Sequence, residues 1–254
     1  MNTFQYHIKG IVATFEQLSK GRFLVFFIPG AVITLIYFLF HYYTTSVKES
    51  MILSSDYSWI DWTFGYINSG MQAVFSVFDL IMEQVYIFII LTFLSPFNTV
   101  LGERLDTRYT GVKFKSGAIR FINDIIRMIF VVILALVLEI TCIFCYWVLS
   151  WFIDLGPIND VVYFIIIAFF YGFAFYDFAL ERYEINVMRS LGFAMSNPLA
   201  MILTGSIFVG IYNIPIVGIP IAPVVSLMVS TIVYLYLTKK LPLDNTKLKE
   251  VGNE

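Results

Sequence analysis

Charged side chains gather in the segment from Ser95 to Gly111, directly after an apolar stretch long enough to cross a membrane. They are Glu103, Arg104, Asp106 and Arg108. Carboxylate and guanidinium groups at this spacing can pair with each other or with neighbouring helices just below the membrane. Breaking a desolvated pair of this kind from one side costs about 3–5 kcal/mol. We therefore assign Glu103 and Arg108 a structural or gating role rather than direct binding of a substrate.

Acidic residues inside apolar segments form a second group. Asp79 and Glu83 stand one helical turn apart in one apolar segment, and Glu139 lies near the middle of another. An acidic residue at the centre of a membrane helix costs roughly 2.5–3.5 kcal/mol, so each is expected to face protein or water, to be paired, or to be protonated. Short helical hairpins would instead bring these groups nearer to the membrane surface. We predict a polar partner for Glu139 and place all three residues in one charge network with Glu103 and Arg108.

Residues typical of metal or catalytic sites are few. Cys142 and Cys145 have the C-x-x-C spacing, but they stand in an apolar segment without the loop or further ligands of a zinc or redox site, so packing is the better interpretation. His7 and His41 are the only histidines and are far apart in the sequence. The sequence has no phosphate-binding glycine loop and no nucleophile elbow. We expect no metal, no cofactor and no enzymatic activity.

The composition indicates the solvent in which these residues work. The chain of 254 residues is 59% hydrophobic and only 13% charged, with a mean hydropathy of +0.82. These values are typical of an integral membrane protein, whose main partner is the lipid bilayer. The net charge of −2 and the absence of a basic stripe interleaved with aromatic residues exclude nucleic acid as a partner.

Apolar periodicity divides the chain into three parts. Residues 1–22 have apolar side chains at helical spacing and predict an amphipathic helix on the cytoplasmic side, lying either on the membrane surface or on its own protein. Residues 23–238 form a single membrane domain, and residues 239–254 form a polar cytoplasmic tail. The membrane domain contains five apolar blocks, which cover residues 23–43, 73–97, 128–153, 161–180 and 199–237.

The boundaries of the blocks predict how the helices are connected. The second block is expected to end at Pro96, and a tight turn at Gly156 and Pro157 joins the third and fourth. The fifth block is too long for one crossing and has glycines and prolines near its centre. Two helices joined by an apolar turn explain it, as a full or a re-entrant hairpin, provided that protein shields the turn or the turn reaches the opposite surface.

Lysine and arginine residues favour one side of the predicted membrane domain. They precede the first block, separate the second from the third, precede the fifth and follow it. The opposite side of the domain is mainly acidic and holds all four tryptophans, Trp59, Trp62, Trp147 and Trp151. Cytoplasmic connections carry an excess of positive residues, so we expect both termini in the cytoplasm. The tryptophans then form an interfacial belt on the outer side.

Three ordered motifs, set among these blocks, carry a resemblance that covers nearly the whole chain. They are Pro96, Phe97, Asn98, Glu103, Leu105, Arg108, Thr110 and Gly111 in the first motif, Tyr176 and Asp177 in the second, and Pro215 and Pro223 in the third. At these spacings the chain resembles the CysZ sulfate-permease and etoposide-induced membrane protein family. The resemblance implies an all-α integral membrane protein with two long spanning helices and helical hairpins that enter the bilayer only partly. It also implies a homo-oligomeric permease that admits sulfate through the bacterial cytoplasmic (inner) membrane.

The family resemblance also selects anion-binding residues. Gly21 stands eight residues before Pro29, where the family has a Gly-Leu-Arg or Gly-Ile-Arg-Arg motif that opens the first spanning helix. Here Arg22 comes one residue earlier than the family arginine, which rotates its side chain by about 100° around a helix. Lys20, Gly21 and Arg22 are therefore anion-binding candidates, with the alternative that the cations hold a helix end at the membrane surface. The alternative function is a non-transporting membrane scaffold, as in relatives linked to membrane organisation.

Overall fold

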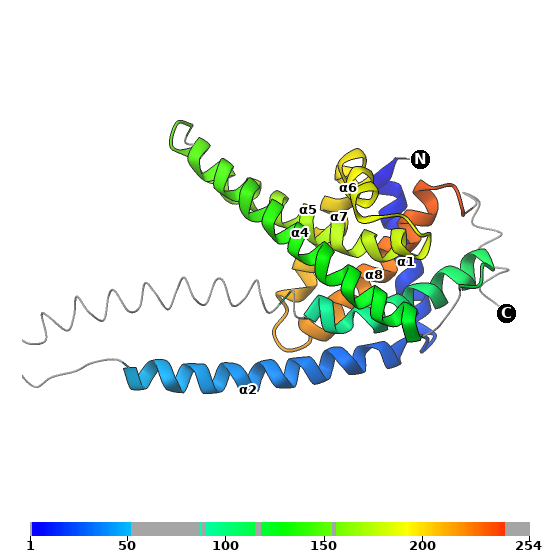
Figure 1. The fold of residues 1–254 in the computed structure, drawn as a ribbon, viewed down its shortest axis with the longest axis horizontal. Coiled ribbons are helices and arrows are strands. Elements are labelled where there is room, and N and C mark those ends of the chain that lie inside the picture. Colours follow the sequence, from blue (N-terminus) through cyan, green and yellow to red (C-terminus); the bar gives the residue numbers. More distant parts are fainter. Residues whose placement is uncertain (1, 52–86, 88–89, 115–117, 154–155, 242–254) are drawn as a thin grey trace, which may run out of the picture.

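The computed structural model describes residues 2–51, 87, 90–114, 118–153 and 156–241, and every regular element in these ranges is a helix. The elements are α1 (Thr3–Ser19), the short 3-10 helix η1 (Leu24–Phe26), α2 (Phe27–Met51), α4 (Ala118–Ser150), α5 (Ile158–Arg182), α6 (Val187–Ser196), α7 (Pro198–Tyr212) and α8 (Gly218–Leu237) (Figure 1). A further helix covers residues 90–110. The chain is an all-α membrane protein, as the sequence predicts.

Three of the described helices are long and apolar enough to cross a membrane. They are Ile122–Ser150 within α4, Ile158–Arg182, which is α5, and Gly218–Leu237, which is α8. Two further candidates are bent pairs: α1 with the start of α2 turns by 99°, and α6 with α7 turns by 96°. The predicted hairpin of the third and fourth blocks is confirmed as α4 and α5. The predicted division of the fifth block is confirmed as α7 and α8.

The first apolar block also forms one helix. α2 has 25 residues, and none before Lys48 is charged. At 1.5 Å per residue it is about 37 Å long, which is enough to cross a hydrocarbon core of about 30 Å. Pro29 stands in its first turn, where a missing backbone N–H is not needed for a helical hydrogen bond.

The second block does not end at Pro96, so this prediction was wrong. The helix over residues 90–110 continues through Pro96 and ends at Gly111, which has φ +74° and donates its N–H to the Thr107 carbonyl at 2.8 Å. Proline is tolerated inside membrane helices because neighbouring groups satisfy the carbonyl that loses its donor. The charged residues from Glu103 to Arg108 consequently lie on this helix rather than in a loop after it.

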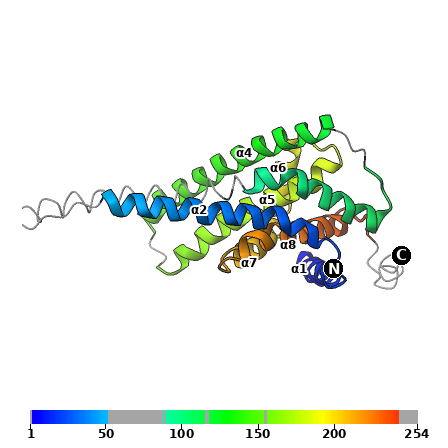
Figure 2. The same ribbon diagram turned by 90° about the horizontal axis from the view of Figure 1, so that it is seen from below.

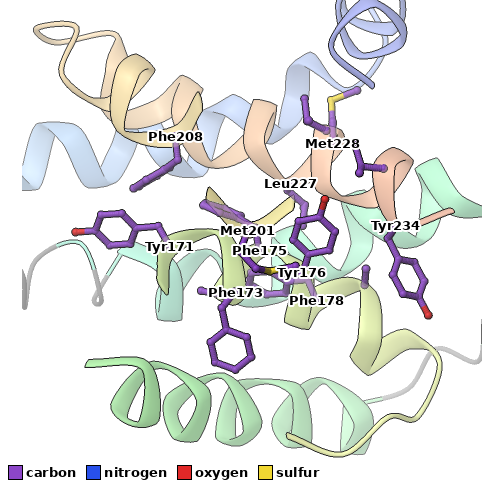
Figure 3. Packing of buried hydrophobic residues seen from close by; sticks show 14 of the residues in the cluster. Tyr171, Phe173, Phe175, Tyr176, Phe178, Met201, Phe208, Leu227, Met228 and Tyr234 are labelled. Carbon is purple, nitrogen blue, oxygen red and sulfur yellow. The ribbon is translucent and has the colours of Figure 1, made fainter. Parts of the chain in front are cut away.

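The core lies between α5, α7 and α8. Figure 3 shows Phe175 and Tyr176 of α5 pointing towards α7 and α8, whereas the ring of Phe173 points towards α4. The backbones of α5 and α7 are in close contact at two glycines. A Cβ atom at Gly172 would overlap the Met201 carbonyl, and a Cβ atom at Gly205 would overlap the Ala168 carbonyl. Small residues at such crossings let membrane helices bring their backbones together.

Basic and tryptophan residues occupy opposite ends of the described structure. The start of α2, the end of the 90–110 helix and the end of α8 lie at one end, and the turn between α4 and α5 lies far from them (Figures 1 and 2). Trp147 and Trp151 stand near that turn, mostly exposed and with ring centroids 4.6 Å apart. Trp59 and Trp62 lie outside the described residues. The two ends therefore differ in chemistry, as the predicted belt and basic side require.

α1 packs against its own protein, but with an unexpected face. Its contacts run mainly to α8 and α7, through His7, Gly10, Thr14 and Gln17, which are buried. Phe4, Ile8, Val12 and Phe15 point outward, whereas Ile11 and Leu18 are partly buried against the core. The helix thus combines the two alternatives that the sequence left open, because its polar and small face meets protein while its apolar face is available to lipid.

Candidate functional site: an arginine pocket

Three arginines line one pocket of about 340 Å³ at the basic end of the structure. Its lining consists of Arg22, Phe23, Val25, Phe26, Arg104 and Arg108. Two segments that are about 80 positions apart in the sequence supply these residues. Among the residues that the structure describes, the lining includes three arginines and no carboxylate.

The bend between α1 and α2 places Arg22 in the pocket. α1 ends at Ser19, Gly21 has φ +71°, and Phe23 has φ +67°, so the chain turns sharply before η1 begins. The backbone N–H of Arg22 donates to the Gln17 carbonyl at 3.2 Å, which ends α1. Since this donor is already used, it is the side chain of Arg22, rather than its backbone N–H, that contributes to the pocket lining.

The 90–110 helix supplies the other two arginines. Arg104 and Arg108 are four residues apart, so they lie on the same face of this helix. The guanidinium carbon of Arg104 lies 5.6 Å from the centroid of the Phe26 ring. This cation–π contact holds the charge of Arg104 over the second segment of the pocket.

Gln17 connects the two sides of the pocket. Its amide oxygen accepts a hydrogen bond from Nη1 of Arg22 at 3.4 Å, and its amide nitrogen donates to the hydroxyl of Tyr109 at 3.4 Å. Burial raises the pKa of Tyr109 above its ordinary value, although the charges of Arg108 and Arg22 oppose the shift. The link from α1 to the 90–110 helix, through the Gln17 amide and the Tyr109 hydroxyl, is therefore neutral and adds no negative charge to the pocket.

Of the three predicted anion-binding residues, only Arg22 lines the pocket. Lys20 is exposed and forms an ion pair with Glu16, with Nζ and Oε1 2.8 Å apart. Gly21 provides the turn and has open space where a Cβ atom would stand. Arg108, which the sequence placed in a gating network, lines the pocket beside Arg22.

A buried ion pair lies behind the pocket and fixes the 90–110 helix to α5. Nε of Arg182 is 3.5 Å from Oδ2 of Asp106, and both side chains are fully buried. The hydroxyl of Tyr183 donates to this carboxylate, at 3.0 Å and 2.9 Å from its two oxygens. Arg182 also donates to Thr231 of α8 at 3.1 Å. We call Asp106, Arg182, Tyr183 and Thr231 the buried cluster.

The Arg182 side chain of the buried cluster packs directly on Gly102 of the 90–110 helix. A Cβ atom at Gly102 would overlap Nη1 of Arg182. Glu103, on the same helix, also acts electrostatically on Arg182. Glu103 thus contributes negative charge near the buried cluster, while Arg108 lies at the pocket.

A second ion pair joins α4, α5 and α6. The guanidinium of Arg127 binds both carboxylate oxygens of Asp177, at 3.1 Å and 2.8 Å. It also donates to the Ile185 carbonyl at 2.6 Å and to the Ser190 hydroxyl at 3.2 Å. This bidentate geometry fixes the three helices relative to each other at the basic end.

Of the three acidic residues predicted in the membrane segments, the structure describes only Glu139, and this residue does not line the pocket. Glu139 is buried on α4, 2% exposed, so its carboxyl group does not lie on the outer surface. Among the residues that the structure describes, its Oε2 has no hydrogen-bond partner. Asp79 and Glu83 lie outside the described residues. Cys142 and Cys145 are free and exposed on α4, so the expectation that they pack in the interior was wrong.

Sequence reasoning missed three features of this end of the molecule. Arg104 was noted as a charge but not as a lining residue, and Arg182 and Arg127 were treated only as positive residues near helix ends. The spacing of four residues between Arg104 and Arg108 indicates one helix face, and this was the sequence signal for two arginines at one site. Comparison with known proteins finds no matching family model and no matching curated protein. The pocket and the buried cluster are therefore the basis for a proposal of function.

Proposed function

We propose that this chain is a CysZ-like anion permease whose arginine pocket binds sulfate at the cytoplasmic end of its path through the membrane. The observation that carries the proposal is the convergence of Arg22, Arg104 and Arg108 on one pocket. Three cations at one site repel each other, and a divalent oxyanion relieves that repulsion. The motifs shared with the CysZ family support sulfate as the anion.

Guanidinium groups suit this substrate. Each presents a planar pair of donors that matches two oxygens of a tetrahedral oxyanion, and charge-assisted hydrogen bonds are about twice as strong as neutral ones. Such bonds are needed because a permease must offset the hydration of a dianion that leaves water. Phe23, Val25 and Phe26 supply an apolar floor that lowers the local dielectric around the charges.

We also propose how the protein is oriented in the membrane and that it forms an oligomer. The end with the arginine pocket faces the cytoplasm of a bacterium, because positive residues gather there, and both termini lie on that side. The protein acts as a homo-oligomer in the inner membrane. The buried cluster holds the 90–110 helix, and with it Arg104 and Arg108, in place during transport.

The test is uptake of labelled sulfate by liposomes that contain the purified protein, with thiosulfate and chloride as competitors. Arg22→Ala, Arg104→Ala and Arg108→Ala each remove one of the pocket charges. We expect each to raise the sulfate concentration for half-maximal uptake by about tenfold, which corresponds to one charge-assisted hydrogen bond of about 1.4 kcal/mol.

The matched control is Arg189→Ala, which changes the net charge equally. Arg189 is exposed on α6 and does not line the pocket. Uptake that falls equally in Arg189→Ala would show that general surface charge, and not the pocket, attracts the anion. Absence of sulfate uptake by folded wild-type protein would contradict the permease and favour a membrane scaffold.

A further inference from the structure

The buried face of α1 contains a titratable group that the proposed transport function does not use. His7 is 3% exposed and lies where α1 packs on α7 and α8. Its Nε2 is 3.0 Å from the Thr204 hydroxyl of α7, and its Nδ1 is 2.9 Å from the Thr3 carbonyl of α1. A carbonyl oxygen only accepts, so Nδ1 carries the proton, and in the neutral imidazole Nε2 accepts from the Thr204 hydroxyl.

The same helix positions an arginine of the pocket. Gln17 is buried ten residues after His7 on α1, and it accepts a hydrogen bond from Arg22. Gly10 lies between them and packs closely on α8, where a Cβ atom would come within 3.1 Å of the Val233 side chain. The contact at His7 and the position of Arg22 therefore depend on the same docked helix.

We propose that α1 is a pH-sensitive docking helix, in which neutral His7 binds Thr204 and keeps Gln17 and Arg22 at the pocket, and protonation of His7 weakens this docking. The effect on the pocket rests on the proposed function. The docking itself does not. His7 is a positioning residue in this scheme, because it acts on Arg22 through α1.

The described residues around His7 offer no negative charge. α7 and α8 contain no Asp, Glu, Lys or Arg. Their titratable groups are tyrosines, of which Tyr236 stacks on Tyr6 of α1 at 5.5 Å, and Nζ of Lys9 lies 5.9 Å from the centroid of the Tyr236 ring. From α5, the hydroxyl of Tyr176 lies next to Thr204. Since these neighbours are neutral phenols or a cation, an imidazolium at this position would have no counter-charge among the described residues.

The direction of the pH effect follows from burial. Burial lowers the pKa of His7 below the ordinary 6.5. The hydrogen bonds between the imidazole and the backbone of Thr3 and Ala200 oppose this shift. The docked state thus binds fewer protons than the undocked state. Docking is fully stabilised above pH 6.5 and weakens as the pH falls below this value.

Hydrogen–deuterium exchange of α1 in lipid nanodiscs tests the proposal, with labelling times scaled to the intrinsic exchange rate at each pH. Between about pH 7.5 and pH 5 we expect protection of α1 to fall by up to about tenfold per pH unit. His7→Gln removes the titrating group and should abolish this dependence. His41→Gln removes the other histidine of the chain and should leave it unchanged. Equal protection of wild-type α1 at every pH, or unchanged dependence in His7→Gln, would overturn the proposal.

Thr204→Val provides a second variant in case His7→Gln does not dock. It keeps the histidine and the side-chain shape but removes the donor to the neutral Nε2. This hydrogen bond favours the neutral form of His7. Without it, the midpoint pH at which the exchange protection of α1 falls should be higher. An unmoved midpoint would show that another group titrates. Sulfate uptake, measured over the same pH range, reports separately on the pocket: failed uptake with pH-dependent exchange contradicts the permease and leaves the docking proposal supported.

Discussion

The arginine pocket and the buried cluster use the same residue type at the same end of the protein, yet with opposite consequences. In the pocket, Arg22, Arg104 and Arg108 line one space whose described lining residues include no carboxylate, and Arg104 is exposed. In the buried cluster, Arg182 is fully buried beside Asp106. The local environment of an arginine, and not its presence at a helix end, therefore separates a site suited to anion binding from one that holds helices together.

The two regions share one element, and this makes the comparison testable. The 90–110 helix carries Arg104 and Arg108 towards the pocket and Asp106 towards α5. Asp106 lies between the two arginines in sequence, and a step of two residues turns a helix by about 200°. Substitutions on this helix should consequently affect either stability or anion binding, according to the face that they change.

The largest effect is expected for Asp106→Asn. Asparagine keeps the shape and can still accept from Tyr183, but it removes the carboxylate that is paired with the buried Arg182 guanidinium. Removing one partner of a buried ion pair typically costs about 3–5 kcal/mol. Thermal unfolding in detergent should show a large loss of stability.

The double variant Asp106→Asn with Arg182→Met sharpens this result. Replacing both charges with neutral groups of similar volume is often neutral or stabilising, so most of the lost stability should return. If Asp106→Asn unfolds at the same temperature as the wild type, the buried cluster does not hold the helices. The contrast between the two regions would then be wrong.

The sequence predicts most of the helices because apolar block length and breaking residues are local signals. The hairpin of α4 and α5 and the division between α7 and α8 both follow from such signals. The passage of the 90–110 helix through Pro96 does not, because packing against other helices decides whether a proline ends a helix. Whether α1 packs on the membrane surface or on its own protein was left open, since periodicity identifies two faces of a helix but not which one meets protein.

The candidate site could be predicted only in part. Arg22 was selected from its place before the first spanning helix, and Arg108 from its motif. Their meeting in one pocket depends on the sharp turn at Gly21 and Phe23 and on the position of the 90–110 helix, which are tertiary features. The pairing of Asp106 with Arg182 joins residues 76 positions apart, and one sequence without aligned relatives has no signal for it.

A smaller effect is expected for Gly102→Ala. Alanine favours a helix by about 1 kcal/mol over glycine, but its Cβ atom would overlap the Arg182 guanidinium. Overpacking of this kind typically costs about 1–3 kcal/mol, so the net change in the free energy of unfolding should be a destabilisation. Gly192→Ala on α6 is the control, because a Cβ atom there meets nothing within 4 Å. Gly102→Ala that is as stable as Gly192→Ala would show that Arg182 moves freely.

The smallest effect is expected for Lys20→Ala, which tests the boundary of the pocket. Lys20 neighbours Arg22 in sequence, but it is exposed and its ammonium group is paired with Glu16 one turn earlier. A helical pair of this spacing contributes about 0.3 kcal/mol, and solvent screens it. Thermal unfolding should change little, and the sulfate concentration for half-maximal uptake should stay near that of the Arg189→Ala control. If Lys20→Ala weakens uptake as much as Arg22→Ala, the anion binds across the whole end of α1, and the three arginines are not a separate site.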